Sequence, residues 1–544
     1  MLTFAMILDN PGEQPQTTRY RDPRVLRDLG YSDLVVYQTT GLSGLLGPHT
    51  LASPDVRQWV TEQYDAVHHT VQTAKDAGLG VWLTYDAPSL ARELMGSAMT
   101  CINHRPPQLC PASDELLEMA GECLDAMIGR FDPIDGIVLR LGDNDAAKLP
   151  YLVGNDVYAP HCSRCASMGR ADRMVRFAKY FYELVVGKLN RKLMIRAWNV
   201  KPGGMHDTPE LCQRIVDRLP EDDRLLLSFK FTQTDFWRYQ KWNPSSLVCG
   251  NRPIIYELQC QREFEGKGAV PNYQPPLWRD GMVEVPDAVG LADVSEQVNL
   301  AGLWAWVRGG GWRGPYVSSD REAWIDANVM AVPKLADDPK AEPDALARQW
   351  VQERLGITED VEVDAILKTL QDSPQNVLQT FYIGPYARGR ADSWHPSANL
   401  MQDDQIDAEA AWTIIQRLSD RDLDELVDEK RAAEQRLTDD YRVMSRIADR
   451  LKEPLCDVLP TSLEYMLTLT QTLAALLSGL AAYRRHLRKP DASQAHEAIA
   501  RLQECQKRWL AHTQAVSSRR GSATTFSSDT LFDMTQRILD ELSD

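Results

Sequence analysis

Eight short apolar runs, each separated from the next by a helical stretch, constrain the fold of this chain more than any other feature. The stretches between them carry helical periodicity, most clearly at residues 53–78 and 169–189. Eight strand and helix units in succession predict a closed (β/α)8 TIM barrel. A doubly wound open sheet is the alternative, but it usually carries a glycine-rich turn after its first strand, and this sequence has none there. The eight runs are TFAMILD, DLVVYQ, LGVWLTY, GIVLRL, KLMIRAW, LLLSFKF, PIIYELQ and AGLWAWV.

The sequence changes character after Val332, where the segment PKLADDPKAEPD is rich in proline and charge. We predict a barrel over residues 1–335 and an all-helical C-terminal domain over residues 336–544. No convincing strand pattern follows the boundary, and the long periodic runs at 408–451 and 462–487 are typical of bundle helices. The leucine-rich run at 462–487 is either the bundle core or the interface of a homodimer, and periodicity alone leaves both interpretations open.

Composition excludes several classes of protein. Of the 544 residues 43% are hydrophobic, which is enough for a large core, and the formal net charge of -17 disfavours nucleic acid and anionic membranes as partners. We find no uninterrupted apolar stretch of 18 residues and therefore predict no membrane span. The first residues lack the basic region of a signal peptide, and most of the ten cysteines stand alone in apolar settings, so we expect a reducing, cytoplasmic location.

Polar and aromatic residues gather where the predicted strands end. In a TIM barrel the loops after the strands converge at one face, where active sites lie. Asp143 follows the fourth run, Asp235 the sixth and Glu263 the seventh, and we predict that these three carboxylates are catalytic. The predicted substrate-binding residues around them are Arg140, Arg196, Lys230, Trp198, Glu257, Trp306, Arg308 and Trp312.

These residue types suit the cleavage of an acidic oligosaccharide. Paired carboxylates supply the acid and the base for glycosidic-bond hydrolysis. Arginine binds a carboxylate in bidentate fashion, and indole rings stack on sugar rings. The alternative is structural: charged residues at strand ends also form salt bridges with each other, and Trp198, Trp304 and Trp306 are equally suited to the barrel core.

Two of these segments resemble the catalytic barrel of family 67 glycoside hydrolases, the α-glucuronidases. The match lies in SFKFTQTDF followed by IIYELQCQREFEG, which is similar to the family's lysine-bearing strand and its E-x-Q-x-x-Q-E-[YF] segment. The resemblance implies inverting release of a glucuronic acid-like residue without a cofactor, with Asp235 and Glu263 as paired general bases. It also implies that Arg196 binds the uronate carboxylate, and that the helical domain serves in dimerisation.

The sequence departs from that family at the general acid. The family has a glutamate four residues after a lysine that ends the fourth strand. Here Arg140 takes the place of the lysine, Asn144 is the fourth residue on, and Asp143 is the nearest acid, with Asp145 a weaker candidate. The family's N-terminal α/β domain has no counterpart either. The chain is therefore identified as a distant relative.

Two other functions stay open at this point. One is a retaining glycosidase for a different acidic sugar, whose two carboxyl groups would lie about 5–5.5 Å apart instead of the 6.5–9.5 Å of an inverting enzyme. The other is a non-catalytic carbohydrate-binding barrel that kept the pocket and lost the acid, because fold alone does not fix function.

A Cys-x-x-Cys motif stands apart from this chemistry, in His161-Cys162-Ser163-Arg164-Cys165. Such a motif is half of a zinc site, and further ligands would have to come from Cys101, Cys110 or His104. Ordinary loop cysteines and a redox pair are the alternatives. We predict no metal for the catalytic step.

Overall fold

The computed structural model supports a structural description of most of the chain. The described residues are 1–42, 53–101, 107–142, 144–145, 149–199, 202–311, 316–390, 401–402, 405–519, 526–527 and 530–543.

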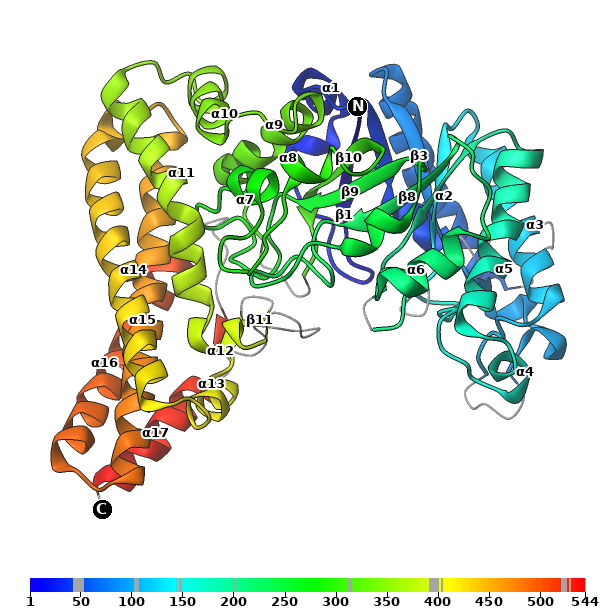
Figure 1. Cartoon of the computed structure of the whole chain (residues 1–544). Coiled ribbons are helices and arrows are strands. Elements are labelled where there is room, and N and C mark those ends of the chain that lie inside the picture. The colour runs from blue at the N-terminus through cyan, green and yellow to red at the C-terminus, as the bar shows by residue number, and fades with distance from the viewer. Residues whose placement is uncertain are drawn as a thin grey trace.

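Eight parallel strands close into a barrel, which confirms the predicted fold (Figure 1). They follow one another around the barrel in chain order, and the last strand pairs with the first. Each apolar run named above contributes one strand. The barrel strands are β1 (Leu2–Leu8), β2 (Asp33–Val36), β3 (Gly80–Asp86), β5 (Gly136–Arg140), β7 (Lys192–Arg196), β8 (Leu225–Lys230), β9 (Ile254–Gln259) and β10 (Leu300–Gly309).

Large side chains fill the inside of the barrel, as two-residue alternation along each strand requires. Trp304 and Trp306 both point inward, where Trp304 joins Phe4 and Trp82 in a buried cluster. The register between β1 and β10 shifts after Trp306, so that Arg308 is paired with Ile7 and leaves the inner face. The inner cluster as a whole contains Phe4, Met6, Leu8, Val35, Tyr37, Trp82, Val138, Met194, Leu226, Phe236, Ile255, Trp304 and Trp306.

Helices surround the barrel, and the predicted helical stretches at 53–78 and 169–189 are among them. Proline or a capping side chain marks several starts: Ser53 caps the helix after β2, and Thr208 caps the helix after β7. The helices are α1 (Pro23–Leu29), α2 (Pro54–Asp76), α3 (Asp114–Phe131), α5 (Arg170–Tyr182), α6 (Pro209–Val216), α7 (Pro275–Asp280), α8 (Leu291–Val294) and α9 (Ala323–Asp337).

Two loops above the barrel pair with each other. The loop after β3 contains β4 (Ser89–Ala91), and the loop after β5 contains β6 (Leu152–Gly154) and the short helix α4 (Ser163–Ala166). Strands β4 and β6 are antiparallel. These loops therefore form one small layer next to the strand ends that carry polar residues.

The C-terminal region is helical and stands beside the barrel as an elongated bundle (Figure 1). Helix α15 packs between α14 and α16. Three two-residue strands also occur there, which the sequence pattern did not predict. The elements are α10 (Pro343–Gln349), α11 (Asp360–Phe381), α12 (Gly384–Arg388), β11 (Met401–Gln402), β12 (Gln405–Ile406), α13 (Ala408–Ile415), α14 (Asp420–Ile447), α15 (Leu455–Arg488), α16 (Ala492–Ser517), β13 (Phe526–Ser527) and α17 (Thr530–Ser543).

Helix α15 contains the leucine-rich run. By length and composition it is the one helix among the described residues that is apolar enough to cross a membrane, contrary to our reading of the sequence. However, 78% of its apolar window is buried inside the molecule. Such burial is typical of the central helix of a bundle and favours the bundle-core interpretation of this run.

The barrel and the helical region share one hydrophobic core. The predicted boundary near residue 335 falls inside α9, which continues past Pro333 to Asp337. Hydrogen bonds also cross the junction: Trp324 Nε1 donates to Ser462 Oγ at 2.7 Å, and Arg238 donates to the Pro374 carbonyl at 2.8 Å. The helical region is thus fastened to the barrel by buried contacts.

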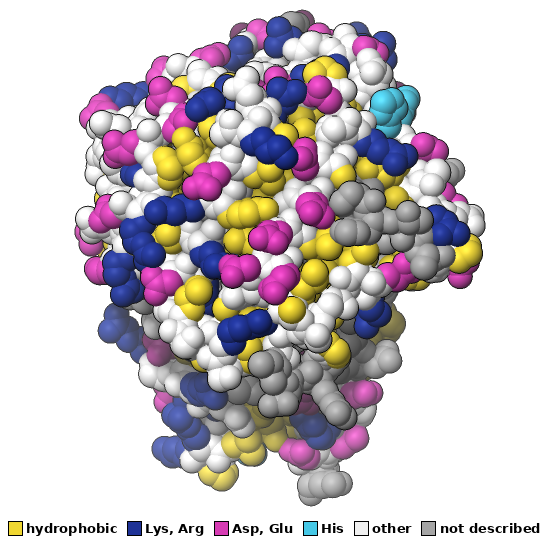
Figure 2. All heavy atoms as spheres, turned by 90° about the vertical axis from the view of Figure 1, so that its right-hand side faces the viewer, with side chains coloured by type: hydrophobic (Ala, Val, Ile, Leu, Met, Phe, Trp, Pro, Cys, Tyr) yellow, Lys and Arg dark blue, Asp and Glu magenta, His cyan; other side chains and the backbone are white. Residues whose placement is uncertain are grey.

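Acidic and basic side chains are interspersed on the face that carries α3 and α5 (Figure 2). Several of them form exposed ion pairs, such as Lys188 with Asp125 and Arg218 with Asp172. The described part of this face therefore carries side chains of both charge signs next to each other.

Candidate functional site

The C-terminal ends of the barrel strands carry a ring of charged side chains. Arg196, at the end of β7, pairs with Glu257 of β9 at 2.9 Å. Ser228 Oγ and Trp306 Nε1 also donate to this carboxylate, at 2.6 and 3.2 Å. Both ends of the pair are buried. Glu257 is therefore held by three donors, and the predicted Arg196 and Glu257 occupy the same site.

A second network surrounds Arg140 at the end of β5. Its guanidinium lies 3.3 Å from Asp86 and 3.0 Å from Asp145. Tyr37 donates a hydrogen bond to Asp145, and the backbone N–H of Asp145 donates to Asp86 at 2.8 Å. Arg140 and Tyr37 thus both donate to the Asp145 carboxylate, which engages its oxygen within this network.

Asp86 was missed in the sequence, although the same signal was present. It is the residue that directly follows the run LGVWLTY, just as the predicted acids follow their runs.

Three aromatic rings surround the ammonium group of Lys230. Its Nζ is 3.6 Å from the ring centre of Trp198, 4.5 Å from that of Phe236 and 4.9 Å from that of Trp306. It also pairs with Asp235, whose side chain keeps 19% of its surface exposed. Cation–π contact and the ion pair together fix the ammonium group where Asp235 reaches the surface.

Glu263 is held by the loop after β10. The backbone N–H of Gly311 donates to its carboxylate, and its own N–H donates to Gln259 Oε1 at 2.8 Å. Gly310 adopts a φ of +88°, and a Cβ there would lie 2.7 Å from Glu263 Oε2. Only glycine fits this close approach. Gly310 and Gly311 thus pack closely around the carboxylate of the predicted base.

The loops that carry Asp235 and Glu263 lie side by side. Trp237 stacks on Phe264 with ring centres 3.8 Å apart and an angle of 6° between the planes. Arg262 donates to the Phe236 carbonyl at 2.7 Å. The immediate neighbours of the two acids are therefore in contact, as their predicted joint role requires.

His206 is a buried residue of this region that the sequence did not single out. Burial lowers its pKa to about 3, and the positive charges of Lys230 and Arg196 add to the effect. The imidazole is neutral at ordinary pH. It packs near Trp198, with ring centres 6.4 Å apart, and adds no charge there.

The remaining residues that we predicted to bind substrate or act in catalysis differ in whether they reach the candidate site. Arg308 is buried outside the inner barrel face, where it binds Glu322, Gln261 and the Val317 carbonyl. Trp198 and Trp306 are 5% and 4% exposed and line the buried side of the cations. Trp304 is fully in the core. Asp143 and Trp312 lie outside the described residues.

Comparison with known proteins shows the fold. No family model and no curated protein matches the sequence. Among solved structures, a GH138 enzyme targeting pectin rhamnogalacturonan II aligns over 100% of this chain and 83% of its own, with 10% identity and a TM-score of 0.58.

Two further structures align at lower similarity. A mutant of the Thermobaculum terrenum O-GlcNAc hydrolase covers 98% of this chain and 94% of its own, with 10% identity and a TM-score of 0.45. CpGH84B covers 99% and 76%, with 8% identity and a TM-score of 0.43. At such low identity, the alignment with the GH138 enzyme shows a shared fold.

Proposed function

We propose that this chain is a glycoside hydrolase that removes a uronic acid residue from an oligosaccharide. The observation that carries the proposal is the contact between the loops of Asp235 and Glu263, above buried indoles and next to Lys230. Carboxylates, a cation and aromatic rings are the groups that an acidic sugar needs. The structural neighbour that targets pectin rhamnogalacturonan II shares this fold and supports the same class of reaction.

In the proposed mechanism Asp235 and Glu263 hold a water molecule and deprotonate it, and the anomeric carbon is inverted. Asp143 is the proposed general acid, because the Asp145 carboxylate already accepts hydrogen bonds from Arg140 and Tyr37. An inverting enzyme needs about 6.5–9.5 Å between acid and base for the water to enter.

Lys230 is the best-placed cation for the substrate carboxylate. Arg140, Arg196 and Lys230 are all buried, but the two arginines are paired with buried carboxylates, whereas Asp235, the partner of Lys230, keeps 19% of its side chain exposed. We therefore propose that Lys230 makes the main contact with the substrate carboxylate. The two arginines add positive charge to the site without touching the substrate. A charge-assisted contact of about 1.5–3 kcal/mol would favour a uronide over the neutral glycoside by one to two decades.

The test is turnover on a panel of aryl and oligosaccharide uronides, with released uronic acid as the readout. Asp235→Asn and Glu263→Gln should each lower kcat by at least two decades while the chain stays folded. Asp235→Asn should also lower the melting temperature, because the buried Lys230 loses its charged partner. Asp280→Asn, an exposed acid on α7, is the matched control and should keep full activity. Normal turnover in both site variants would refute the assignment of the base.

The same assay separates the alternatives. Proton NMR of the first-formed product shows inversion or retention at the anomeric carbon, and retention would replace the inverting mechanism by a nucleophilic one. A carbohydrate-binding barrel would show thermal stabilisation by the uronide without any product. Equal activity on glucosides and glucuronides would contradict uronate recognition.

A further inference from the structure

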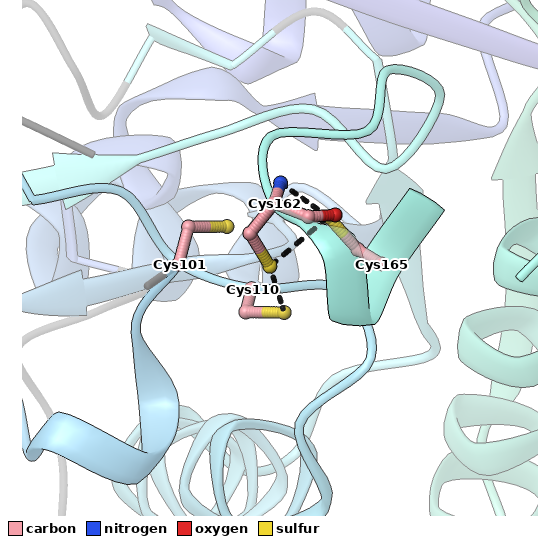
Figure 3. Close-up of side chains that lie close together, drawn as sticks. All are labelled: Cys101, Cys110, Cys162 and Cys165. Carbon is pink, nitrogen blue, oxygen red and sulfur yellow. Dashed lines mark hydrogen bonds between the residues drawn. The ribbon is translucent and has the colours of Figure 1, made fainter. Parts of the chain in front are cut away.

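Four cysteines from two loops meet above the barrel (Figure 3). Cys101 and Cys110 belong to the loop after β3, and Cys162 and Cys165 flank the start of α4 in the loop after β5. All four Sγ atoms lie within 4.8 Å of one another. We propose that these four thiolates bind one zinc ion, which serves a structural role.

The spacing of the sulfur atoms fits a single tetrahedral ion. With zinc–sulfur bonds of about 2.3 Å, the sulfurs of a tetrahedral site lie about 3.8 Å apart. Cys162 Sγ is 3.6 Å from Cys110 Sγ and 3.6 Å from Cys165 Sγ. All four cysteines are free. Disulfides would join them two by two and would not explain why all four converge on one point.

The surroundings stabilise negative charge on the sulfurs. The backbone N–H groups of His161 and Cys162 donate to Cys165 Sγ at 3.0 and 3.2 Å, and Arg164 Nε donates to Cys110 Sγ at 3.3 Å. Four thiolates around zinc carry a net charge of -2, which the single guanidinium of Arg164 offsets by half. Donors directed at the ligating atoms are the outer contacts that metal sites require.

The site is closed, which indicates a structural rather than a catalytic ion. Cys101, Cys110 and Cys165 are buried and Cys162 is partly buried. Four protein ligands leave no position for water or substrate. The Cys-x-x-Cys motif thus finds its missing half in two cysteines more than 50 residues earlier, and the ring of His161 is not needed as a ligand.

The ion would join the two loops that hold the Arg140 network. Strands β4 and β6 pair at one end of this layer, and Arg164 donates to the carbonyls of Ala98 and Thr100 at 2.9 and 3.1 Å at the other. Asp86 precedes one loop, and Arg140 precedes the other. Loss of zinc should therefore loosen the layer next to the charged ring without removing any residue from it.

Metal analysis of the purified full-length chain tests the proposal directly. We expect one zinc per chain after purification without chelators, and less than a tenth of that amount in Cys101→Ser and in Cys165→Ser. Cys212→Ser is the matched control, since Cys212 and Cys249 form a buried pair 3.9 Å apart outside the cluster. This variant should keep its zinc.

A second measurement on the wild-type chain covers the case in which the cysteine variants do not fold. Exchange of the bound metal for cobalt under reducing conditions should give the sulfur-to-metal charge-transfer bands and strong visible absorption of a tetrahedral thiolate site. Equimolar iron in place of zinc, a disulfide within the cluster, or a metal-free chain that takes up no cobalt would each overturn the proposal. None of these results depends on hydrolase activity.

Discussion

At the scale of single residues, the arginines of the charged ring are paired with carboxylates from other strands. Arg196 of β7 binds Glu257 of β9, and Arg140 of β5 binds Asp86 of β3. Such pairs stabilise little when complete, because desolvation opposes their attraction, but breaking one leaves a buried charge without its partner. Their main effect is to fix the positions of the charged side chains at the strand ends.

Glu257→Gln tests this balance. The amide keeps the shape of the side chain and removes the charge that faces Arg196, so we expect a loss of about 3–5 kcal/mol of unfolding free energy. Urea denaturation of the purified protein measures it. Glu296→Gln breaks an exposed pair with Lys340 and should leave the urea midpoint unchanged. Equal midpoints for Glu257→Gln and wild type would show that the Arg196 charge is not held by this pair.

His206 predicts a pH dependence of stability. Its pKa is about 3 in the folded chain and 6.5 in the unfolded chain, so between these values the unfolded chain binds one more proton. This contribution is complete above pH 6.5 and is lost as the pH falls toward 3. In His206→Gln the slope of unfolding free energy against pH should be smaller by up to about 1.4 kcal/mol per pH unit in that window.

His512 adds to the same slope with the same sign, because burial lowers its pKa to about 4. His68→Gln, on the exposed face of α2, is the control and should leave the slope unchanged. A slope that is identical in wild type and His206→Gln would mean that the imidazole is protonated in the folded chain.

Some residues of the candidate site could be predicted from the sequence, and others could not. Acids that directly follow strands are visible, because strand ends mark the barrel face, and this rule led to Asp235 and Glu263. The partner of each charge is not visible, since the salt bridge between Arg196 and Glu257 joins residues 61 apart in the chain, on two strands that β8 separates. For the same reason Cys101 and Cys110 could only be suggested as companions of the Cys-x-x-Cys motif.

At the scale of elements, the loops after β9 and β10 fit each other closely around Glu263. Gly310→Ala should push the carboxylate from its place, because the new Cβ would lie 2.7 Å from Glu263 Oε2 and 2.5 Å from Gln259 Nε2. We expect kcat on the best uronide substrate to fall at least tenfold. Steady-state kinetics measures the change.

Gly78→Ala is the matched control for that variant. Gly78 has a similar φ of +76°, so the backbone strain is comparable, but a Cβ there has nothing within 4 Å. It precedes β3 at the opposite end of the strands, and its variant should lose stability but not activity. If both variants had the same kcat, contact with Glu263 would not matter for catalysis.

A hydrogen bond from the helical region also holds the loop after β9. Tyr382, just after α11, donates to Glu265 at 2.6 Å, and Glu265 in turn binds Arg262 beside the proposed base. Tyr382→Phe removes one donor from a buried carboxylate and should cost about 1–3 kcal/mol. We also expect a lower kcat with little change in KM, since Glu263 loses its support while the substrate contacts stay. A proportional rise in KM alone would indicate a different role.

Elements could be predicted better than their boundaries. All eight strands follow from apolar runs, because a strand buried on both faces needs such a run. The end of α9 does not, since Pro333 and the charged residues after it resemble a linker although the helix continues to Asp337. Tertiary packing against β1 and β10 outweighs the local signal. Strands β11 to β13 are too short to leave any pattern.

At the scale of the whole molecule, the barrel and the bundle depend on each other. One buried core runs through both, and Trp324 of α9 packs against Trp350 and bonds to Ser462 of α15. A barrel cut off after α9 would expose this surface. The isolated bundle would in turn lose the contact between Ser462 of α15 and Trp324 of α9. Dimerisation through the helical region stays a prediction, and the molar mass measured by light scattering decides it.

The shared core predicts that the full chain unfolds in one cooperative transition. Calorimetry should show a single peak, because the bundle cannot melt without exposing the apolar surface of α9 and releasing the contacts of Arg238 and Tyr382. The fragment 1–337 should be insoluble or should melt far below the full chain. Two resolved peaks, with the fragment melting at the temperature of one of them, would instead establish two independent domains. Melting of the bundle would then break the hydrogen bond from Tyr382 to Glu265, and with it the support of the loop that carries Glu263, while the barrel stayed folded.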